Sequence, residues 1–372
     1  MDAARAREVA ARPILPSNPA VEFALGARRA PSGGDGTFWS ARLSQELEIA
    51  GQRGLRREEA GALVNAQGAR LLQARRNAAA EAWLAYFELS AAERQQSISG
   101  RFEIMAKQVR DAAKAMSGNG LLSPVDADLA EMSWSQARQT ALSSQATTRR
   151  LELQLATLVG ALPGPPAPDV APDLEPLRDV EAFAKGVAAR GADLPEARAL
   201  QLEQQALRSR AALLRRSRVP NLTLSAFFER DKFEGRLAGG AVSMPLPLPE
   251  PVGRTASGEI AESEALASRS ETELRLLKRR AQLQVAQGLS ELEAKRVELG
   301  ALDANQVALA ERNLEALGNE VRAGRIPVRD ALVSQERLIG FLRARVEAEL
   351  AVAEASVELA RVSGFPLERS GS

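Results

Sequence analysis

Residues 50–117 read AGQRGLRREEAGALVNAQGARLLQARRNAAAEAWLAYFELSAAERQQSISGRFEIMAKQVRDAAKAMS, and this run without proline decides the fold. Helix interiors exclude proline, and the run is rich in Ala, Leu, Glu, Arg and Gln, which favour helices. Apolar side chains recur at helical spacing, at Ala79, Ala80, Trp83, Leu84 and Phe87. We predict one helix over 50–117, roughly 100 Å long at 1.5 Å per residue. Such a length indicates coiled-coil-like packing.

The second half of the chain contains a similar run. Residues 254–323 also lack proline, and Leu314, Leu317 and Val321 recur at helical spacing near its end. We predict a second very long helix over 254–323. Prolines delimit shorter runs of the same composition, which predict shorter helices over 124–160, 196–218 and 328–363.

Four segments show a period of two in place of the helical period. Apolar and polar residues alternate over 21–28, 39–46, 222–229 and 237–246. Such alternation predicts strands with one apolar and one polar face. The first two segments are joined by Pro31 to Gly36 and the second two by Asp231 to Gly235, so we predict two hairpins, at about 20–47 and 221–248.

The proline-rich segment Pro163 to Pro176 divides the chain into two similar halves. Each half runs in the order hairpin, long helix, glycine-containing turn, shorter helix. The matched positions are Pro19-Ala20-Val21 with Pro220-Asn221-Leu222, Arg53 with Arg254, Gly120 with Gly324, Asp126 with Asp330, and Leu155-Ala156 with Leu359-Ala360. We therefore predict a repeat over 1–162, a linker or equatorial region over 163–195, and a second repeat over 196–372.

Composition excludes several function classes. The net charge of +1 gives no electrostatic case for nucleic acid. The chain has no histidine and no cysteine, so it cannot form a Ser-His-Asp or Cys-His triad or a zinc thiolate site. Carboxylate, Lys or Tyr chemistry remains formally possible. We expect no enzyme activity, no cofactor and no metal site.

The sequence contains neither a transmembrane helix nor a visible export signal. No stretch approaches about 20 consecutive apolar residues, and Met1 to Arg5 starts without an apolar region. Either the protein is cytosolic, or the numbering begins after the export signal.

Four strands from one chain cannot bury their own apolar faces. Several copies could close into a membrane barrel, since only closed barrels or helices satisfy every backbone group in lipid. The alternative is that the hairpins cap a soluble helical bundle, which the low aromatic content of 4% favours. Phe38-Trp39 and Phe227-Phe228 are the candidates for an aromatic girdle.

The order and duplication of several motifs resemble TolC-family outer-membrane efflux proteins over nearly the whole chain. Residues 43–53 (LSQELEIAGQR) resemble the strand-to-helix junction of the cation-efflux (CzcC-like) branch. Val242 to Leu248, followed by Gly253-Arg254, resembles the corresponding junction in the second half. Arg190 to Leu194 resembles the family's Arg-Pro-Asp-Leu segment, with Gly191-Ala192 in place of the proline. Val321 to Gln335 resembles the turn after the second long helix.

The resemblance implies a mainly α fold with a small β part. Three protomers would form a twelve-strand β-barrel in the outer membrane, continued by an α-helical barrel into the periplasm. The implied partners are two further copies of the chain, a periplasmic adaptor, an inner-membrane pump and outer-membrane lipid. The CzcC-like junction favours heavy-metal cations as cargo. Drug or organic-compound efflux, a protein-export duct and a soluble coiled-coil scaffold are the alternatives.

The two turns between long and short helices are the functional candidates. Glycine suits the end of the incoming helix, and proline the first turn of the outgoing one. The predicted adaptor-docking tips are Gly120, Leu121, Leu122, Ser123, Gly324, Arg325, Ile326 and Pro327. Of these, Leu121, Leu122, Ile326 and Pro327 are apolar where solvent exposure is expected, which often marks a partner surface.

The predicted pore gate consists of Asp330 and Asp126. The resemblance implies that Asp330 points into the pore at its periplasmic entrance. Val333 stands where the family has a second carboxylate, and Ile326 where it has an arginine, so Arg325 or Arg329 is left to act as a latch. The alternative for both aspartates is that they stabilise a helix N-terminus through the helix dipole.

Overall fold

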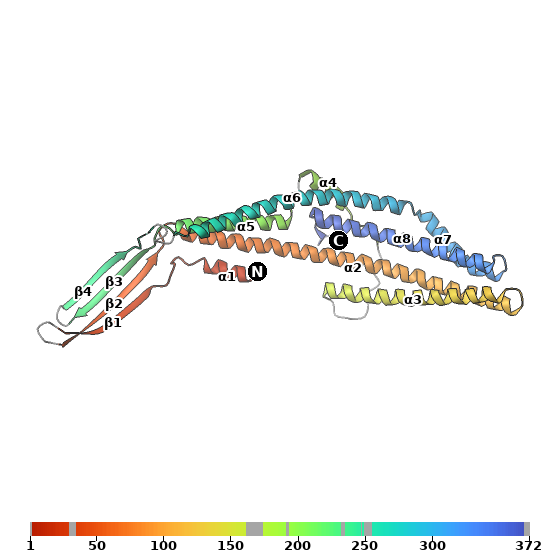
Figure 1. Ribbon diagram of the computed structural model, residues 1–372, viewed down its shortest axis with the longest axis horizontal. Coiled ribbons are helices and arrows are strands. Elements are labelled where there is room, and N and C mark those ends of the chain that lie inside the picture. Colours follow the sequence, from red (N-terminus) through yellow and green to blue (C-terminus); the bar gives the residue numbers. More distant parts are fainter. Residues whose placement is uncertain are drawn as a thin grey trace. The chain divides into compact units, whose positions relative to one another are not determined.

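The computed structural model describes residues 2–29, 35–160, 174–190, 193–231, 235–246, 248 and 255–367. It is mostly helical with one small antiparallel sheet, which confirms the predicted fold class. The elements in chain order (Figure 1) are α1 (Asp2–Ala10), β1 (Ala20–Arg29), β2 (Asp35–Leu47), α2 (Gln52–Gly118), α3 (Pro124–Val159), α4 (Val180–Arg190), α5 (Pro195–Arg216), β3 (Leu222–Asp231), β4 (Gly235–Ser243), α6 (Ser257–Gly300), α7 (Ala304–Arg322) and α8 (Val328–Ser363).

The chain forms two compact units, and each draws residues from both halves of the sequence. Unit 1 consists of Met1–Gln73 and Asp193–Lys278, and unit 2 of Ala74–Ala192 and Arg279–Ser372. The helices α1 and α4 were not expected from the sequence; α4 lies inside the range assigned to the linker. Most of the proline-rich segment lies outside the described residues, as do Pro247, Gly253 and Arg254.

The two hairpins of unit 1 form one sheet in the order β1-β2-β3-β4, with every neighbouring pair antiparallel (Figure 1). The pairing of β2 with β3, from Leu47 opposite Leu222 to Phe38 opposite Asp231, joins the first hairpin to the second. The strand β4 ends at Ser243, earlier than expected, because Pro245 lacks the N–H that would continue the ladder. The expected loops fall largely outside the described residues.

One face of this sheet is apolar and exposed. The register places on it Val21, Phe23, Leu25, Trp39, Ala41, Leu43, Leu224, Ala226, Phe228 and Val242. Three aromatic rings run across it, with centroids of Phe23 and Trp39 5.9 Å apart and those of Trp39 and Phe228 5.3 Å apart. The other two girdle candidates, Phe38 and Phe227, lie on the opposite face, because neighbouring residues alternate in a strand.

The helices of unit 1 pack through small residues. Alanines of α5 are buried at 197, 199, 206 and 211, and alanines of α2 at 60, 62, 66 and 69. Small side chains let helices approach closely. Ion pairs join Arg70 of α2 to Glu203 of α5, and Arg215 of α5 to Glu264 of α6.

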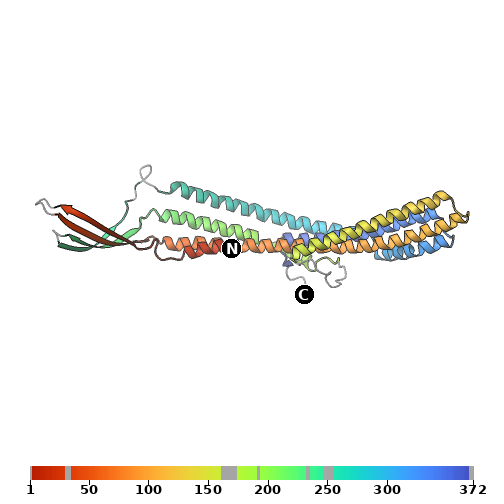
Figure 2. The same cartoon turned by 90° about the horizontal axis from the view of Figure 1, so that it is seen from below.

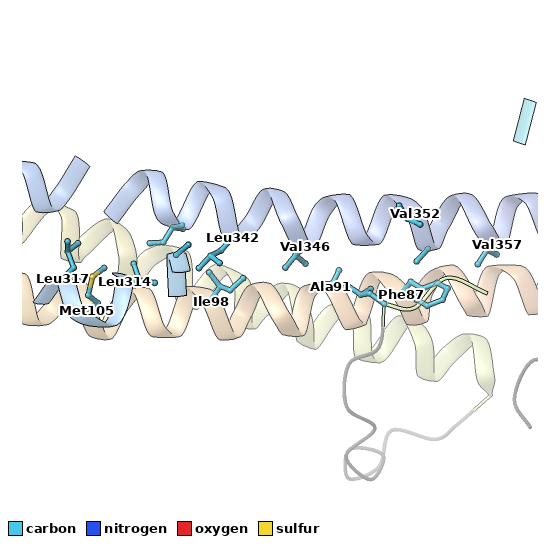
Figure 3. Close-up of a cluster of buried hydrophobic side chains, with 14 of the residues drawn as sticks. Phe87, Ala91, Ile98, Met105, Leu314, Leu317, Leu342, Val346, Val352 and Val357 are labelled. Carbon is cyan, nitrogen blue, oxygen red and sulfur yellow. The ribbon is translucent and has the colours of Figure 1, made fainter. Parts of the chain in front are cut away.

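The core of unit 2 lies between α2, α7 and α8. Phe87, Ala91 and Ile98 of α2 are buried at helical spacing and face Leu342, Val346, Val352 and Val357 of α8 (Figure 3). Met105 of α2 meets Leu314 and Leu317 of α7 in the same row of side chains (Figure 3). The helices α7 and α8 pack against each other. Figure 2 shows α3 (yellow) alongside the part of α2 (orange) that belongs to unit 2, and an ion pair joins Lys114 of α2 to Glu131 of α3.

The helix predicted over 254–323 is in fact two helices. It begins at Ser257, ends at Gly300 and resumes as α7 at Ala304. Asp303 caps α7, since its side chain accepts a hydrogen bond from the backbone N–H of Asn305 at 3.1 Å. The guanidinium of Arg345 donates to the carbonyls of Leu299 and Leu302, at 3.1 and 2.6 Å. At the break, backbone carbonyls at the end of α6 and a backbone N–H at the start of α7 thus have hydrogen-bond partners.

Within the described ranges, none of the helices has both the length and the apolar character needed to cross a membrane.

Candidate functional site

The turn after α2 is a left-handed glycine cap. Gly120 has φ +70°, which L side chains rarely adopt. Its N–H donates to the carbonyl of Ser117 at 3.0 Å, and the N–H of Leu121 donates to that of Met116 at 2.9 Å. This pair of bonds is the Schellman arrangement, which satisfies the last carbonyls of the helix.

The turn after α7 repeats this geometry. Gly324 also has φ +70°, its N–H donates to the carbonyl of Val321 at 2.9 Å, and the N–H of Arg325 donates to that of Glu320 at 3.0 Å. Two segments from different halves of the chain thus build the same turn, as the shared Gly and Asp spacing led us to expect.

The outgoing helices start differently. Pro124 occupies the first turn of α3, and Ser123 caps it by accepting from the N–H of Val125 at 3.3 Å. Pro327 lies one residue before α8, as its N-cap, and offers no side-chain cap. The expected proline position therefore holds for α3, whereas in α8 the helix begins at Val328, which is buried.

The four apolar tip residues do not all face solvent. Leu121 is 73% exposed and Pro327 is exposed, as expected. Leu122 and Ile326 are half-buried and pack against the core of unit 2. Their expected exposure is wrong, because the chain reverses just after the glycine and turns these side chains back between the helices. The outward surface of the tips is formed by Leu121, Ser123, Arg325 and Pro327.

The two carboxylates differ in environment. Asp126 lies in the first turn of α3 and is half-buried, with its Oδ1 3.7 Å from Nη2 of Arg329. This ion pair places the two turns side by side. Asp330 lies in the first turn of α8, is exposed, and makes no hydrogen bond or ion pair with the described part of the chain. Of the two arginines left open as a latch, Arg329 contacts Asp126, whereas Arg325 pairs with Glu320 at 3.1 Å.

Both aspartates also sit where a helix N-terminus favours negative charge. The helix-dipole explanation is thus available to each of them. It accounts for Asp126, which also has an arginine partner. For Asp330 the helix N-terminus is the sole compensation within the described chain, because no cationic side chain there pairs with it.

A half-buried cluster of charges away from the turns was missed by sequence reasoning. Glu349 accepts from Nε of Arg345 at 2.7 Å and from Nη1 of Arg94 at 2.6 Å. The i,i+4 spacing of Arg345 and Glu349 was a visible signal for part of it. Arg94 is distant in sequence, so only the fold reveals the complete cluster. It ties α8 to α2 and to the break between α6 and α7.

Two further glutamates in unit 2 are held in environments that disfavour their charge. Burial raises the pKa of Glu354, and the nearby carboxylate of Glu88 raises it further. Burial likewise raises the pKa of Glu93, with Glu152 as the second cause. Among the described residues, no three acidic side chains gather in a way that could hold a metal ion.

The whole chain is similar to solved outer-membrane channels. The outer-membrane channel OprN matches with a TM-score of 0.79 and 18% identity, over 99% of this chain and 85% of that chain. VceC of Vibrio cholerae matches with 0.74 and 18%, over 98% and 91%. CusC, whose structures concern folding and transmembrane channel formation, matches with 0.76 and 13%, over 98% and 87%.

These likenesses show that the chain has the fold of the TolC-family outer-membrane efflux channels. No protein-family model and no curated protein matches the sequence. The agreement is therefore one of three-dimensional arrangement and extends over both the sheet and the helices.

Proposed function

We propose that this chain is one protomer of an outer-membrane duct, the channel component of a tripartite efflux system. The observation that carries the proposal is the extent of the structural match, which covers 99% of the chain against OprN. A likeness confined to the helices would suit any coiled-coil scaffold. Here the match includes a four-strand sheet with an exposed apolar face, as expected of a surface that meets lipid.

The sheet also supports assembly into a homotrimer. Among the described strands, β1 and β4 each have one neighbour, so each leaves a row of backbone groups unpaired. Pairing of β4 with β1 of the next copy would remove both edges, and three copies would close a twelve-strand barrel. The apolar face would then meet lipid, and the helices would continue into the periplasm.

Threefold symmetry would gather three copies of Asp330 at the narrow end of the helical barrel. Rings of carboxylates attract cations and make pores cation-selective. We expect the resting duct to conduct poorly, prefer cations and be blocked by divalent ions. The ion pair of Asp126 with Arg329 supports a secondary role for Asp126, beside the ring.

Planar-bilayer recording tests this function directly. The purified protein should form channels, and Asp330→Ala should lose most of the cation preference and the divalent block. Glu347→Ala is the matched control, because it removes one exposed carboxylate per protomer from the same helix, far from the turn. Absence of any channel activity contradicts the duct. If the channels of the Asp330→Ala variant keep their cation preference and divalent block, the constriction lies at other residues.

The outward surface of the turn tips is proposed to meet the periplasmic adaptor, which links the duct to an inner-membrane pump. Leu121 is its most exposed apolar residue. Leu121→Asp should abolish efflux in cells without lowering the yield of assembled protein. Leu142→Asp is the control, since Leu142 is also exposed but lies within α3. Equal loss in both variants would contradict docking at the tips.

Heavy-metal cations are the proposed cargo, and the basis is the likeness of residues 43–53 to the CzcC-like junction. Within the described part of one chain no three acidic side chains gather to hold a metal ion, so we expect selection to lie in the pump. Deleting the gene should sensitise cells to divalent heavy metals. Sensitisation to organic drugs alone would favour the alternative cargo.

A further inference from the structure

The region between the sheet and the helices of unit 1 combines exposed aliphatic side chains with arginines that lack acidic partners. Its exposed aliphatic residues, which we call the junction aliphatics, are Ile14, Leu15, Ile49, Met244, Leu246 and Leu248. The most exposed of them are Leu246 at 79% and Ile14 at 72%. They lie outside the strands, in the segments that connect the sheet to the helices (Figure 1).

Three arginines of this region, the junction arginines, are Arg53, Arg216 and Arg218. Each donates to a backbone carbonyl: Arg53 to Arg12 at 3.2 Å, Arg216 to Ala50 at 3.3 Å, and Arg218 to Thr255 at 2.8 Å. These bonds fix the guanidinium groups at the junction. None of the three forms an ion pair with a carboxylate in the described part of the chain.

The carboxylates nearby are already engaged. Glu48 accepts two hydrogen bonds from Arg56, at 2.5 and 2.9 Å, and Glu264 pairs with Arg215. Glu46 accepts from the amide of Asn221 at 2.8 Å. The amide of Asn221 is neutral, so Glu46 keeps its negative charge, but Glu46 forms no ion pair with a junction arginine in the described part of the chain. The three junction arginines therefore outnumber the one uncompensated carboxylate among these glutamates.

The position of Arg53 in its helix is electrostatically unfavourable. It lies in the first turn of α2, where the helix dipole disfavours positive charge, and this turn contains no acidic residue. Its hydrogen bond to the carbonyl of Arg12 leaves this positive charge uncompensated, so the position gains further stability only if negative charge is brought to it. An anion outside the chain would supply that gain.

We propose that the junction arginines bind the phosphate groups of anionic phospholipids in the periplasmic leaflet of the outer membrane. The proposal rests on the proposed function, in which the sheet crosses the membrane and the helices lie in the periplasm. The junction then lies at the headgroups. Guanidinium groups match phosphate oxygens with paired hydrogen bonds, and the junction aliphatics reach the boundary of the acyl chains.

The test measures lipids retained by the assembled protein. The full chain is exchanged into micelles that contain equal amounts of phosphatidylglycerol and phosphatidylcholine. Native mass spectrometry then measures how many molecules of each lipid stay bound to the protein. The wild type should prefer phosphatidylglycerol, and each arginine should contribute about fivefold to that preference. R53Q/R216Q/R218Q should retain both lipids equally.

The control variant K278Q/R279Q/R280Q removes the same charge from three exposed residues of α6 and should keep the wild-type preference. If the triple variant does not assemble, the lipid preference is measured on the single variants R216Q and R218Q, whose side chains are exposed. Millimolar inorganic phosphate should not displace the lipid.

A preference that survives the triple variant, falls equally in the control, or is absent in the wild type overturns the proposal. Loss of trimer in the single variants also overturns it, because the arginines would then contact a neighbouring protomer. None of these outcomes bears on the duct itself, which is contradicted by different results: no channel activity in planar bilayers, or a stable monomer that needs no detergent.

Discussion

At the scale of single residues, the glycines of the two turns are constrained by their backbone conformation. Gly120 and Gly324 share φ +70°, where a Cβ would be strained. The sequence revealed them through their matched spacing to Asp126 and Asp330. It could not reveal that Leu122 and Ile326 turn inward, since the direction of a side chain after a left-handed residue depends on the neighbouring helices.

Gly324→Ala should therefore destabilise the protein by about 1–2 kcal/mol, the cost of a left-handed conformation for an L residue. Gly340→Ala is the control, because Gly340 lies inside α8 with a helical backbone and open space around its Cα. It should stabilise by about 0.5–1 kcal/mol. Thermal unfolding of both variants gives the comparison, and equal shifts would contradict the strained turn.

Glu354 predicts a pH dependence of stability. Its pKa is raised in the folded state, first by burial and then by Glu88, so folding favours its protonated form. The ionised side chain therefore lowers the free energy of unfolding. This destabilisation is absent below the ordinary glutamate pKa of 4.5, grows as the pH rises above it, and is complete above the raised pKa of the folded state. Glu354→Gln should raise the unfolding temperature at pH 7 and change it little near pH 4. A gain that is equal at both values would contradict the account.

At the scale of elements, proline spacing and period-two alternation predicted the strands and most of the helices. The break between α6 and α7 was missed because the run 254–323 lacks proline and was interpreted as one helix, although Gly300 ends α6 and Asp303 is a good N-cap residue. Its stability comes from Arg345, which lies on α8 and reaches the last carbonyls of α6. This tertiary contact, unlike the cap by Asp303, leaves no local pattern in the sequence.

Arg345→Gln should remove these charged hydrogen bonds and lower the local stability of the backbone between α6 and α7 by roughly 2 kcal/mol. Hydrogen exchange of the backbone amides around residues 298–306 should become faster, while the middle of α3 should be unaffected. Arg337→Gln, at an exposed position of the same helix, is the control. Unchanged exchange in Arg345→Gln would mean that Asp303 alone holds the break.

At the scale of the whole molecule, one sequence repeat does not correspond to one compact unit. The register joins the hairpins of the two halves into a single sheet, and the two turns meet through Asp126 and Arg329. Sequence comparison within the chain could find the duplication. It could not show which surfaces the halves share, because those contacts are set by packing between segments far apart in the chain.

The central claim is that this sheet is completed only by other copies of the chain in a membrane. The most direct test is the mass of the purified protein in detergent, measured by light scattering with the detergent contribution subtracted. The account predicts a homotrimer, with three times the 39.8 kDa of the chain, that precipitates when the detergent is removed. A stable monomer that stays in solution without detergent would contradict it.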